Sequence, residues 1–274
     1  VVLQRTYRFD SRSNLGRLAR QIRDGAVADA LASLRDSDEP ALRWMAPVEP
    51  GLPAAFWTAI LEGFAPYFDA VSRPDANPSD AQQTFDRFRV LCALRLGPRG
   101  AEAINRAVSR WLVDRGPDHP GSMVPNAWYA GRPVMVRRND ALLRLFNGDI
   151  GWTLAGPDGR LSVHFPDPEG GWRALAPHRL PPCDTAFAMT VHQSQGSEFD
   201  TAAIVLPAQP GPAVTRELLY TAVTRSRRAL LLCGSAAVVT QAIATPMQRR
   251  SGLIARLREA LAASNRADPA GAPS

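Results

Sequence analysis

The sequence predicts an α/β fold that is interrupted by a small all-β unit. In the first and last parts of the chain, short apolar runs of strand type alternate with stretches whose apolar residues recur every three or four positions. Between about residues 131 and 182 the apolar period shortens to two, and turn-forming clusters recur at the spacing of about 8–12 residues that is typical of small all-β units. We therefore expect three segments, 1–129, 130–184 and 185–274, of which the middle one is inserted into an α/β domain.

Residues 1–129 contain one strand-turn-helix unit and two further helices. The apolar start at residues 1–4 predicts the end of a strand that begins earlier, so we expect the chain to be a fragment. Asn14 is the expected N-cap of a helix, because apolar residues follow it at 15, 18 and 22, and residues 53–68 predict a second helix. Residues 89–96 predict a strand that ends at Gly97-Pro98, and residues 100–115 predict the helix that follows it.

The apolar period and the turn-forming clusters also predict the elements of the middle and last segments. In the middle segment, strands are expected at 133–137, 150–154 and 161–165, with turns at 147–149, 157–159 and 169–171. In the last segment, strands are expected at 186–190, 202–206 and 229–233, and helices at 215–226, 236–244 and 253–263. The tail at 268–274 is rich in proline, glycine and alanine and is expected to fray.

The composition excludes several kinds of chemistry. All 32 basic residues are arginine, so the chain lacks the lysine that a GxxxxGK[ST] phosphate-binding loop or a Schiff base requires.

The formal net charge is +6, and residues 185–274 hold 9 arginines against 5 acids, which favours an acidic partner such as nucleic acid. Its three cysteines are far apart in the sequence, and no apolar run is long enough to span a membrane, so we expect a cytoplasmic protein. Its four histidines do not fall at metal-ligand spacing, so we expect no metal site.

Three segments resemble the fourth, fifth and sixth helicase motifs of superfamily 1. They are LQRTYRF from residue 3, TVHQSQGSEFD from residue 190 and LYTAVTRSRRAL from residue 219, and they occur in the expected order. The joining segments LCALRLGPRG, WYAGRPVMVRRND, LFNGDIGWTL and RRSGLIARL resemble the C-terminal part of the RecD family, the alpha subunits of exodeoxyribonuclease V. This resemblance covers nearly the whole chain and implies a second RecA-like (P-loop NTPase-type) helicase domain with an SH3-like β insert.

The resemblance implies two arginines that act on the nucleotide. Arg225 is expected at the end of a helix and corresponds to the arginine of the sixth motif, which reaches the γ-phosphate, and Arg8 corresponds to that of the fourth. Arginine suits this task because its planar, permanently charged fork binds phosphate oxygens bidentately. The other residues that we assign to the nucleotide are Gly196, Glu198, Gln4 and Tyr220.

The fifth motif supplies the expected contacts to single-stranded DNA. Thr190, His192, Gln193 and Ser194 can all donate to phosphate oxygens, which is how proteins follow a nucleic-acid backbone without sequence readout. His192 as a general base lacks a nearby nucleophile, which leaves a DNA contact or a packing role. From the insert we add Arg137 and Arg138, with Arg144 beside them. Its aromatic residues Trp128, Tyr129 and Trp152 are either base-stacking surfaces or the core of the module.

These expectations define the C-terminal motor half of an ATP-dependent 5′-to-3′ DNA helicase, in a RecBCD-type helicase/nuclease of double-strand break repair. Such a half would need ATP, Mg²⁺ and an N-terminal RecA-like domain, and it would meet single-stranded DNA and RecB-like and RecC-like subunits. Alone it is expected not to hydrolyse ATP. The alternatives are a non-catalytic module that binds single-stranded DNA or docks on other subunits, and a fragment of a stand-alone RecD-like or conjugative helicase.

Overall fold

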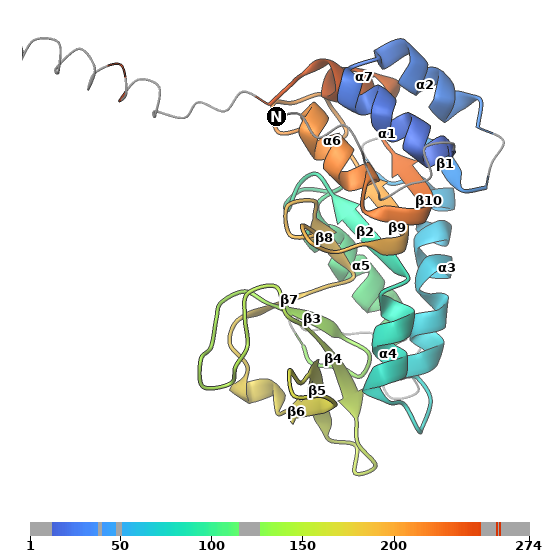
Figure 1. Ribbon diagram of the computed structural model, residues 1–274. Coiled ribbons are helices and arrows are strands. Elements are labelled where there is room, and N and C mark those ends of the chain that lie inside the picture. Colours follow the sequence, from blue (N-terminus) through green and yellow to red (C-terminus); the bar gives the residue numbers. More distant parts are fainter. Residues whose placement is uncertain are drawn as a thin grey trace, which may run out of the picture.

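The protein contains two sheets of different kinds, which confirms the predicted α/β class. The computed structural model describes residues 13–37, 40–47, 51–114 and 127–247, together with Arg256 and Arg258. One sheet is parallel and lies among helices, and the other is antiparallel and lies beneath it in the view of Figure 1. The expected strand at 1–4 and the tail at 268–274 lie outside the described residues, and so does the helix at 253–263 apart from Arg256 and Arg258.

The parallel sheet has the strand order β1-β10-β9-β2-β8. Its strands are β1 (Leu42–Met45), β2 (Phe88–Cys92), β8 (Ala188–Thr190), β9 (Phe199–Val205) and β10 (Ser226–Cys233). Every residue of β2 is buried, as expected for a strand covered on both faces. Its neighbours β9 and β8 come after the insert in sequence, so the sheet is completed only when the chain returns from the antiparallel unit.

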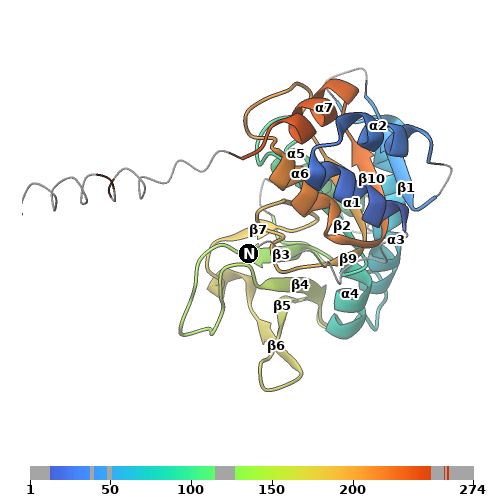
Figure 2. The ribbon, with the colours of Figure 1, turned by 45° about the horizontal axis from the view of Figure 1, so that its top comes forward.

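The helices form two groups around the parallel sheet. α1 (Asn14–Asp24), α2 (Val27–Arg35), α6 (Arg216–Val223) and α7 (Ala236–Ala244) contact one another, as Figure 2 shows from above. α3 (Ala54–Val71), α4 (Pro78–Phe85) and α5 (Ala101–Asp114) contact β2, and α5 also contacts β8. α5 therefore lies on the side of the domain nearest to the second sheet (Figure 1).

The antiparallel sheet has the order β6-β5-β4-β3-β7. It is built from β3 (Pro133–Val136), β4 (Ile150–Ala155), β5 (Leu161–Pro166), β6 (Trp172–Leu175) and β7 (Cys183–Thr185), with a short 3-10 helix at Pro177–Arg179. Because β7 pairs with β3, the two ends of this unit lie side by side where they join the parallel domain. A small apolar cluster of its own contains Val134, Val163 and Phe165.

The core of the α/β domain continues into the antiparallel sheet. Trp152 on β4 is 2% exposed and belongs to the same apolar cluster as α3, α4 and the parallel strands. Its ring lies 6.1 Å from that of Phe85 at the end of α4 and 5.7 Å from that of Trp172 on β6. The two sheets are thus joined by aromatic packing as well as by the chain.

Several predicted boundaries change in the structure. The N-cap of α1 is Ser13, whose hydroxyl accepts from the Gly16 amide, so Asn14 is the first helical residue and not the cap. The strand expected at 89–96 ends at Cys92, because residues 93–100 turn into α5. The helix expected at 215–226 ends at Val223, and the strand after it begins at Ser226 rather than at residue 229.

Candidate nucleotide and nucleic-acid interface

The turn after β8 is held by a closed set of hydrogen bonds between Thr190 and Gln193. The amide and hydroxyl of Thr190 both donate to Gln193 Oε1, at 2.9 and 3.0 Å, and the Gln193 amide donates to the Thr190 carbonyl at 3.0 Å. The Gln193 side chain is exposed, so its amide nitrogen is presented at the surface. This arrangement fixes two of the predicted DNA-contacting side chains in one place.

His192 and Ser194, on either side of Gln193, lie in opposite environments. His192 is exposed, which disfavours a packing role in the core. Ser194 is fully buried, and its hydroxyl donates to the Val191 carbonyl at 2.8 Å. Ser194 therefore does not present its hydroxyl to solvent, and in this structure it shapes the turn instead of offering a donor to a phosphate.

Gly196 takes a backbone conformation that other residues rarely adopt. Its φ is +89°, and a Cβ added there would meet no atom within 4 Å. Glycine is therefore favoured by the left-handed backbone and not by crowding. The open space beside it is compatible with a ligand that approaches the backbone.

Arg225 lies between α6 and β10, and both its side chain and its backbone hold the turn. The Arg225 side chain is almost completely buried, with Nε donating to the Thr221 carbonyl at 3.2 Å and Nη1 to the Ser197 carbonyl at 3.0 Å. Its own carbonyl accepts from the Phe199 amide at 2.8 Å. Thus the guanidinium is fixed at the end of α6 against residues 197–199.

Residues 191–198 run from one end of the parallel sheet to the other. Thr190 is the last residue of β8, whereas Glu198 directly precedes β9, which is parallel to β8 in the same sheet. Phe199 pairs with Ser226, so Glu198 and Arg225 precede neighbouring strands at the same level. One short segment therefore connects the Thr190–Gln193 turn to the surroundings of Arg225.

Charged side chains surround the second end of this segment. Glu198 accepts from Arg227 Nε at 3.1 Å, and Arg228 Nε lies 3.9 Å from Asp200 Oδ1. Tyr220, on α6, is half-buried and packs against the core. Glu198 and Tyr220 are thus on the same two elements that hold Arg225.

A cavity of about 460 Å³ separates the turn from α6. Val191, His192 and Gln195 line it from the turn. Glu217, Leu218 and Thr221 line it from α6, and Met247 also lines it. The exposed His192 therefore lines the space between the predicted DNA-contacting turn and the helix that leads to Arg225.

The insert contributes basic groups at its surface, but two of its three aromatic candidates are part of the core. Trp152 and Tyr129 are both buried, and the Tyr129 hydroxyl bonds the Ser109 hydroxyl. Both side chains are almost completely buried, which disfavours the alternative in which these two rings stack on bases. Trp128 is partly buried, with the Arg132 guanidinium 4.7 Å from its ring centre.

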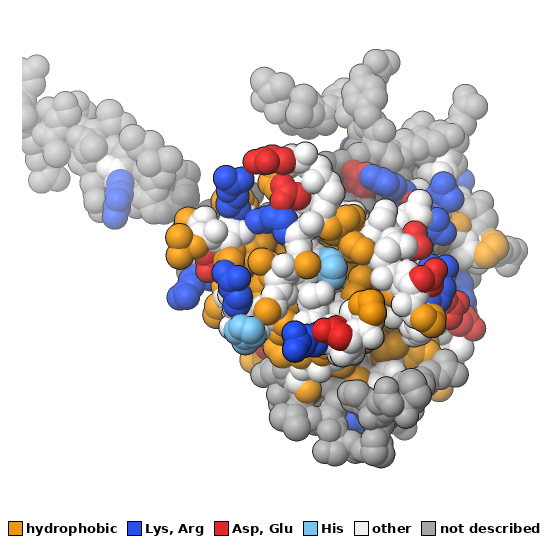
Figure 3. Space-filling model, turned by 90° about the horizontal axis from the view of Figure 1, so that it is seen from below, with side chains coloured by type: hydrophobic (Ala, Val, Ile, Leu, Met, Phe, Trp, Pro, Cys, Tyr) orange, Lys and Arg blue, Asp and Glu red, His pale blue; other side chains and the backbone are white. Residues whose placement is uncertain are grey.

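Arg137 and Arg138 are exposed at the end of β3. Arg137 Nε lies 3.5 Å from Asp184 Oδ2, and Arg144, on the following loop, pairs with Glu169 at 3.2 Å. On the face shown in Figure 3, the basic side chains of the described residues lie at several separate places, with acidic side chains beside some of them. Arg8 and Gln4, which were assigned to the nucleotide, lie outside the described residues.

One buried arginine of β2 has no counterpart in the sequence prediction. Arg89 on β2 is fully buried, its guanidinium lies 3.6 Å from the Phe85 ring centre and 4.9 Å from that of Phe199, and Nη1 donates to the Ala186 carbonyl at 2.9 Å. Burial lowers the pKa of Arg89 to about 9, and Asp86 opposes this effect only partly. Phe85 and Phe199 are far apart in the sequence. The packing of Arg89 between them therefore leaves no periodic pattern from which it could be predicted.

Part of this site matches the model of a known protein family. Residues 185–233 match the family model of the UvrD-like helicase C-terminal domain. The matched segment contains both the turn after β8 and Arg225.

Over most of its length the chain matches RecD subunits, which confirms the resemblance expected from the motifs. It is 36% identical over 262 residues to the RecBCD enzyme subunit RecD of Mycolicibacterium smegmatis, covering 94% of this chain and 44% of that protein. It is 39% identical over 244 residues to the RecD of Mycobacterium tuberculosis, covering 89% of this chain and 40% of that protein. The chain therefore spans less than half the length of these relatives.

A solved structure with a more distant similarity is that of the Pif1 helicase from Bacteroides in complex with ADP-AlF3 and single-stranded DNA. The two are 18% identical, with a TM-score of 0.39, and the match covers 81% of this chain and 56% of that one.

No helix within the described residues is long and apolar enough to cross a membrane.

Proposed function

We propose that this chain is the C-terminal motor half of an ATP-dependent 5′-to-3′ DNA helicase, a subunit of a RecBCD-type helicase/nuclease that acts in double-strand break repair. The observation that carries the proposal is the bond from Arg225 Nη1 to the Ser197 carbonyl. It ties the arginine proposed for the nucleotide to the segment that begins at the turn proposed for DNA. A motor needs such a connection, whereas a simple DNA clamp does not.

On the nucleotide side, Arg225 is the proposed γ-phosphate arginine and Arg8 its partner from the fourth motif. The Thr221 and Ser197 carbonyls hold the Arg225 guanidinium in one orientation, which lowers the entropy lost when it meets a phosphate. Gly196, with open space beside it, and Glu198 are proposed to lie next to the nucleotide, together with Gln4 and Tyr220. This donor set suits a phosphate chain because it offers a fixed cation beside an accessible backbone.

On the DNA side, Thr190, His192 and Gln193 are proposed to contact the backbone of single-stranded DNA, with Arg137 and Arg138 as further basic groups. Thr190 and Gln193 are joined by four hydrogen bonds, so they are presented as a unit. We assign Ser194 the role of holding this turn through its bond to Val191.

The chain cannot complete an ATP site alone under this proposal. It contains no lysine, so the phosphate-binding loop and the groups that hold Mg²⁺ must come from an N-terminal RecA-like domain of the same protein. ATP would then bind between that domain and the Arg225 surface. RecB-like and RecC-like subunits are the proposed protein partners.

The decisive experiment compares ATP hydrolysis by the 274-residue chain with hydrolysis by the longer protein that includes the upstream half. We expect no turnover by the chain alone and DNA-stimulated turnover by the longer protein. Unwinding of forked DNA with a 5′ single-stranded tail, but not with a 3′ tail, would establish the polarity.

Two outcomes would overturn the proposal. Turnover by the 274-residue chain alone would mean that it contains a complete site. DNA binding by the longer protein without any DNA-stimulated hydrolysis would instead support the non-catalytic binding module.

A further inference from the structure

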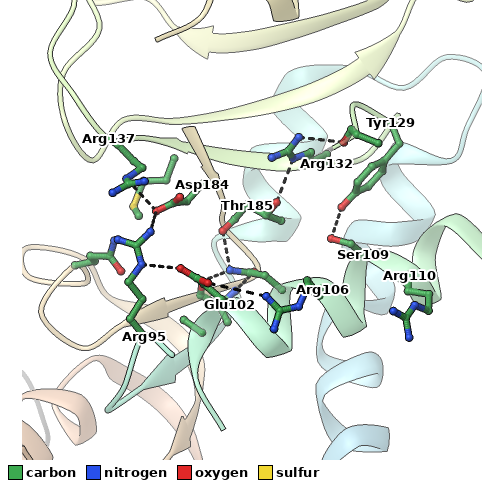
Figure 4. A pocket seen from close by; sticks show the side chains of 16 residues that line it. Arg95, Glu102, Arg106, Ser109, Arg110, Tyr129, Arg132, Arg137, Asp184 and Thr185 are labelled. Atoms are coloured by element: carbon green, nitrogen blue, oxygen red, sulfur yellow. Dashed lines mark hydrogen bonds and ion pairs between the residues drawn. The ribbon is translucent and has the colours of Figure 1, made fainter. Parts of the chain in front are cut away.

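A second cavity, of about 440 Å³, lies between α5 and the antiparallel unit (Figure 4). Its walls come from both parts of the molecule: Glu102, Arg106 and Arg110 lie on α5, whereas Arg132 and Asp184 belong to the insert. Gln193 of the turn after β8 also lines it. The cavity is therefore continuous with the turn that is proposed to contact DNA.

The lining of this cavity is strongly basic. Five arginines contribute to it, and only two carboxylates oppose them. The arginines are Arg95, Arg106, Arg110, Arg132 and Arg137, and the carboxylates are those of Glu102 and Asp184. The excess of positive charge favours an anionic ligand.

Two of the arginines are already paired with the carboxylates. Arg95 lies 2.8 Å from Glu102 and 3.5 Å from Asp184, and Arg137 lies 3.5 Å from the same Asp184 oxygen. Figure 4 shows Asp184 between the two guanidinium groups. Asp184 thus occupies the position that an anionic oxygen of a ligand would take.

The two arginines on α5 are more available. Arg106 is 65% exposed, and its contact with Glu102 is long, at 3.9 Å. Arg110 is exposed one turn further along the helix, and no ion pair joins it to another residue in the part of the chain that the structure describes. The spacing of four residues places both side chains on the same face of α5.

The floor of the cavity is rigid. The Asn105 side chain donates to the Thr185 and Ala188 carbonyls and accepts from the Ala188 amide, each at 2.8 Å. Arg132 is buried, and its guanidinium donates to Thr185 Oγ1 at 3.1 Å and to the Ala127 carbonyl at 3.0 Å. Arg132 is therefore held in place before any ligand binds.

We propose that this cavity binds a phosphodiester of single-stranded DNA through Arg106 and Arg110, and that Asp184 is an internal counter-ion which competes with that phosphate for Arg95 and Arg137. The inference extends the proposed function, since it assumes that DNA lies along the turn after β8. Continuity with Gln193 favours nucleic acid over an acidic protein segment, because one strand could contact both places.

The test measures binding of a short fluorescent oligothymidylate to the 274-residue chain by anisotropy over a range of salt concentrations. Arg106→Gln with Arg110→Gln should weaken binding by about tenfold per lost charge-assisted contact. The salt slope, d log K/d log[salt], should become shallower by about 0.7 per lost contact on a single strand. Asp184→Asn should strengthen binding, by about threefold at low salt, because a competing charge is removed.

The matched control is Arg160→Gln, since Arg160 is a 90% exposed arginine of the same insert that does not line the cavity. It removes one positive charge but should leave affinity and salt slope nearly unchanged. Thermal unfolding of every variant identifies any loss of folded protein.

Three results would overturn the inference. The first is unchanged oligothymidylate binding in the α5 double variant. The second is weaker binding in Asp184→Asn with unaltered thermal stability. The third is binding of polyglutamate that is as strong as binding of oligothymidylate and as sensitive to the same variants. If the wild-type chain binds oligothymidylate and Thr190→Ala weakens it while the α5 variants do not, this inference fails and the proposed function stands. If the wild-type chain and the longer protein both fail to bind the oligonucleotide, the proposed function itself fails.

Discussion

The Arg225 guanidinium donates to the Ser197 carbonyl at 3.0 Å, although the two residues are 28 positions apart in the sequence. The contact joins the end of α6 to the segment 191–198, which starts at the carboxyl end of β8. A displacement of the Thr190–Gln193 turn would therefore be transmitted to the position of Arg225. In the proposed motor, this is how DNA binding and nucleotide binding are coupled.

Arg225→Ala is expected to lower DNA-stimulated kcat of the longer protein by about 10³ to 10⁵, the range found for arginines that act on a transferring phosphoryl group. Arg225→Lys should be almost as defective, because an ammonium keeps the charge but cannot make both carbonyl bonds in the same plane. Thermal unfolding of both variants shows whether the buried site still folds. Near wild-type kcat in Arg225→Lys would refute the proposed role of the planar guanidinium group.

Gly196→Ala should reduce the free energy of unfolding by about 1–2 kcal/mol, the cost of a left-handed conformation for a residue with a side chain. No clash adds to this, because a Cβ at that position meets no atom within 4 Å. Urea denaturation measures the difference. The comparison variant is Gly63→Ala, which should be more destabilising because its Cβ would overlap the Phe88 ring. If Gly196→Ala destabilised the protein more than Gly63→Ala, the explanation by backbone conformation alone would be contradicted.

Trp152→Ala should destabilise the protein by about 3–5 kcal/mol, as expected for truncating a buried tryptophan. The loss should affect both sheets in one transition, since Trp152 packs against Phe85 of the α/β domain as well as Trp172 of the insert. Leu142→Ala is the control, because Leu142 is 96% exposed on the same unit and should have almost no effect. Two separate transitions in the wild type would show that the units fold independently.

Burial raises the pKa of Tyr129 from 10.0 to about 12, although its hydrogen bond with Ser109 opposes the shift. The unfolded chain therefore loses this proton first, so the free energy of unfolding should decrease as the pH rises from about 10 to about 12. One such group changes the slope by at most about 1.4 kcal/mol per pH unit. Burial also raises the pKa of Tyr67, so Tyr129→Phe should reduce the alkaline slope without abolishing it. Denaturation at a series of alkaline pH values measures this change, and an unaltered slope in Tyr129→Phe would contradict it.

Local patterns predicted all of the longer elements and some of the short ones, but missed several others. The helices α3 and α5 and the strands β4 and β5 were expected within a few residues, because each has a clear apolar period. The short elements α2, α4 and β1 were not expected. β1 is defined by its parallel pairing with β10, which is distant in sequence, and Leu42 is its only fully buried residue. Such a strand depends on its partner, and its own sequence gives little sign of it.

The sequence alone determined the α/β class, the absence of lysine and therefore of a phosphate-binding loop, and the motif residues from which a helicase half is proposed. These properties depend on residue type and spacing, which are local. Tertiary structure decided that Ser194 is buried while His192 is exposed, that Trp152 belongs to the core, and that Arg89 is buried between Phe85 and Phe199. Each of these depends on contacts between residues far apart in the chain, and a linear pattern does not contain that information. The same is true of the basic cavity beside α5, since its two walls meet only when the chain returns from the insert to complete the parallel sheet.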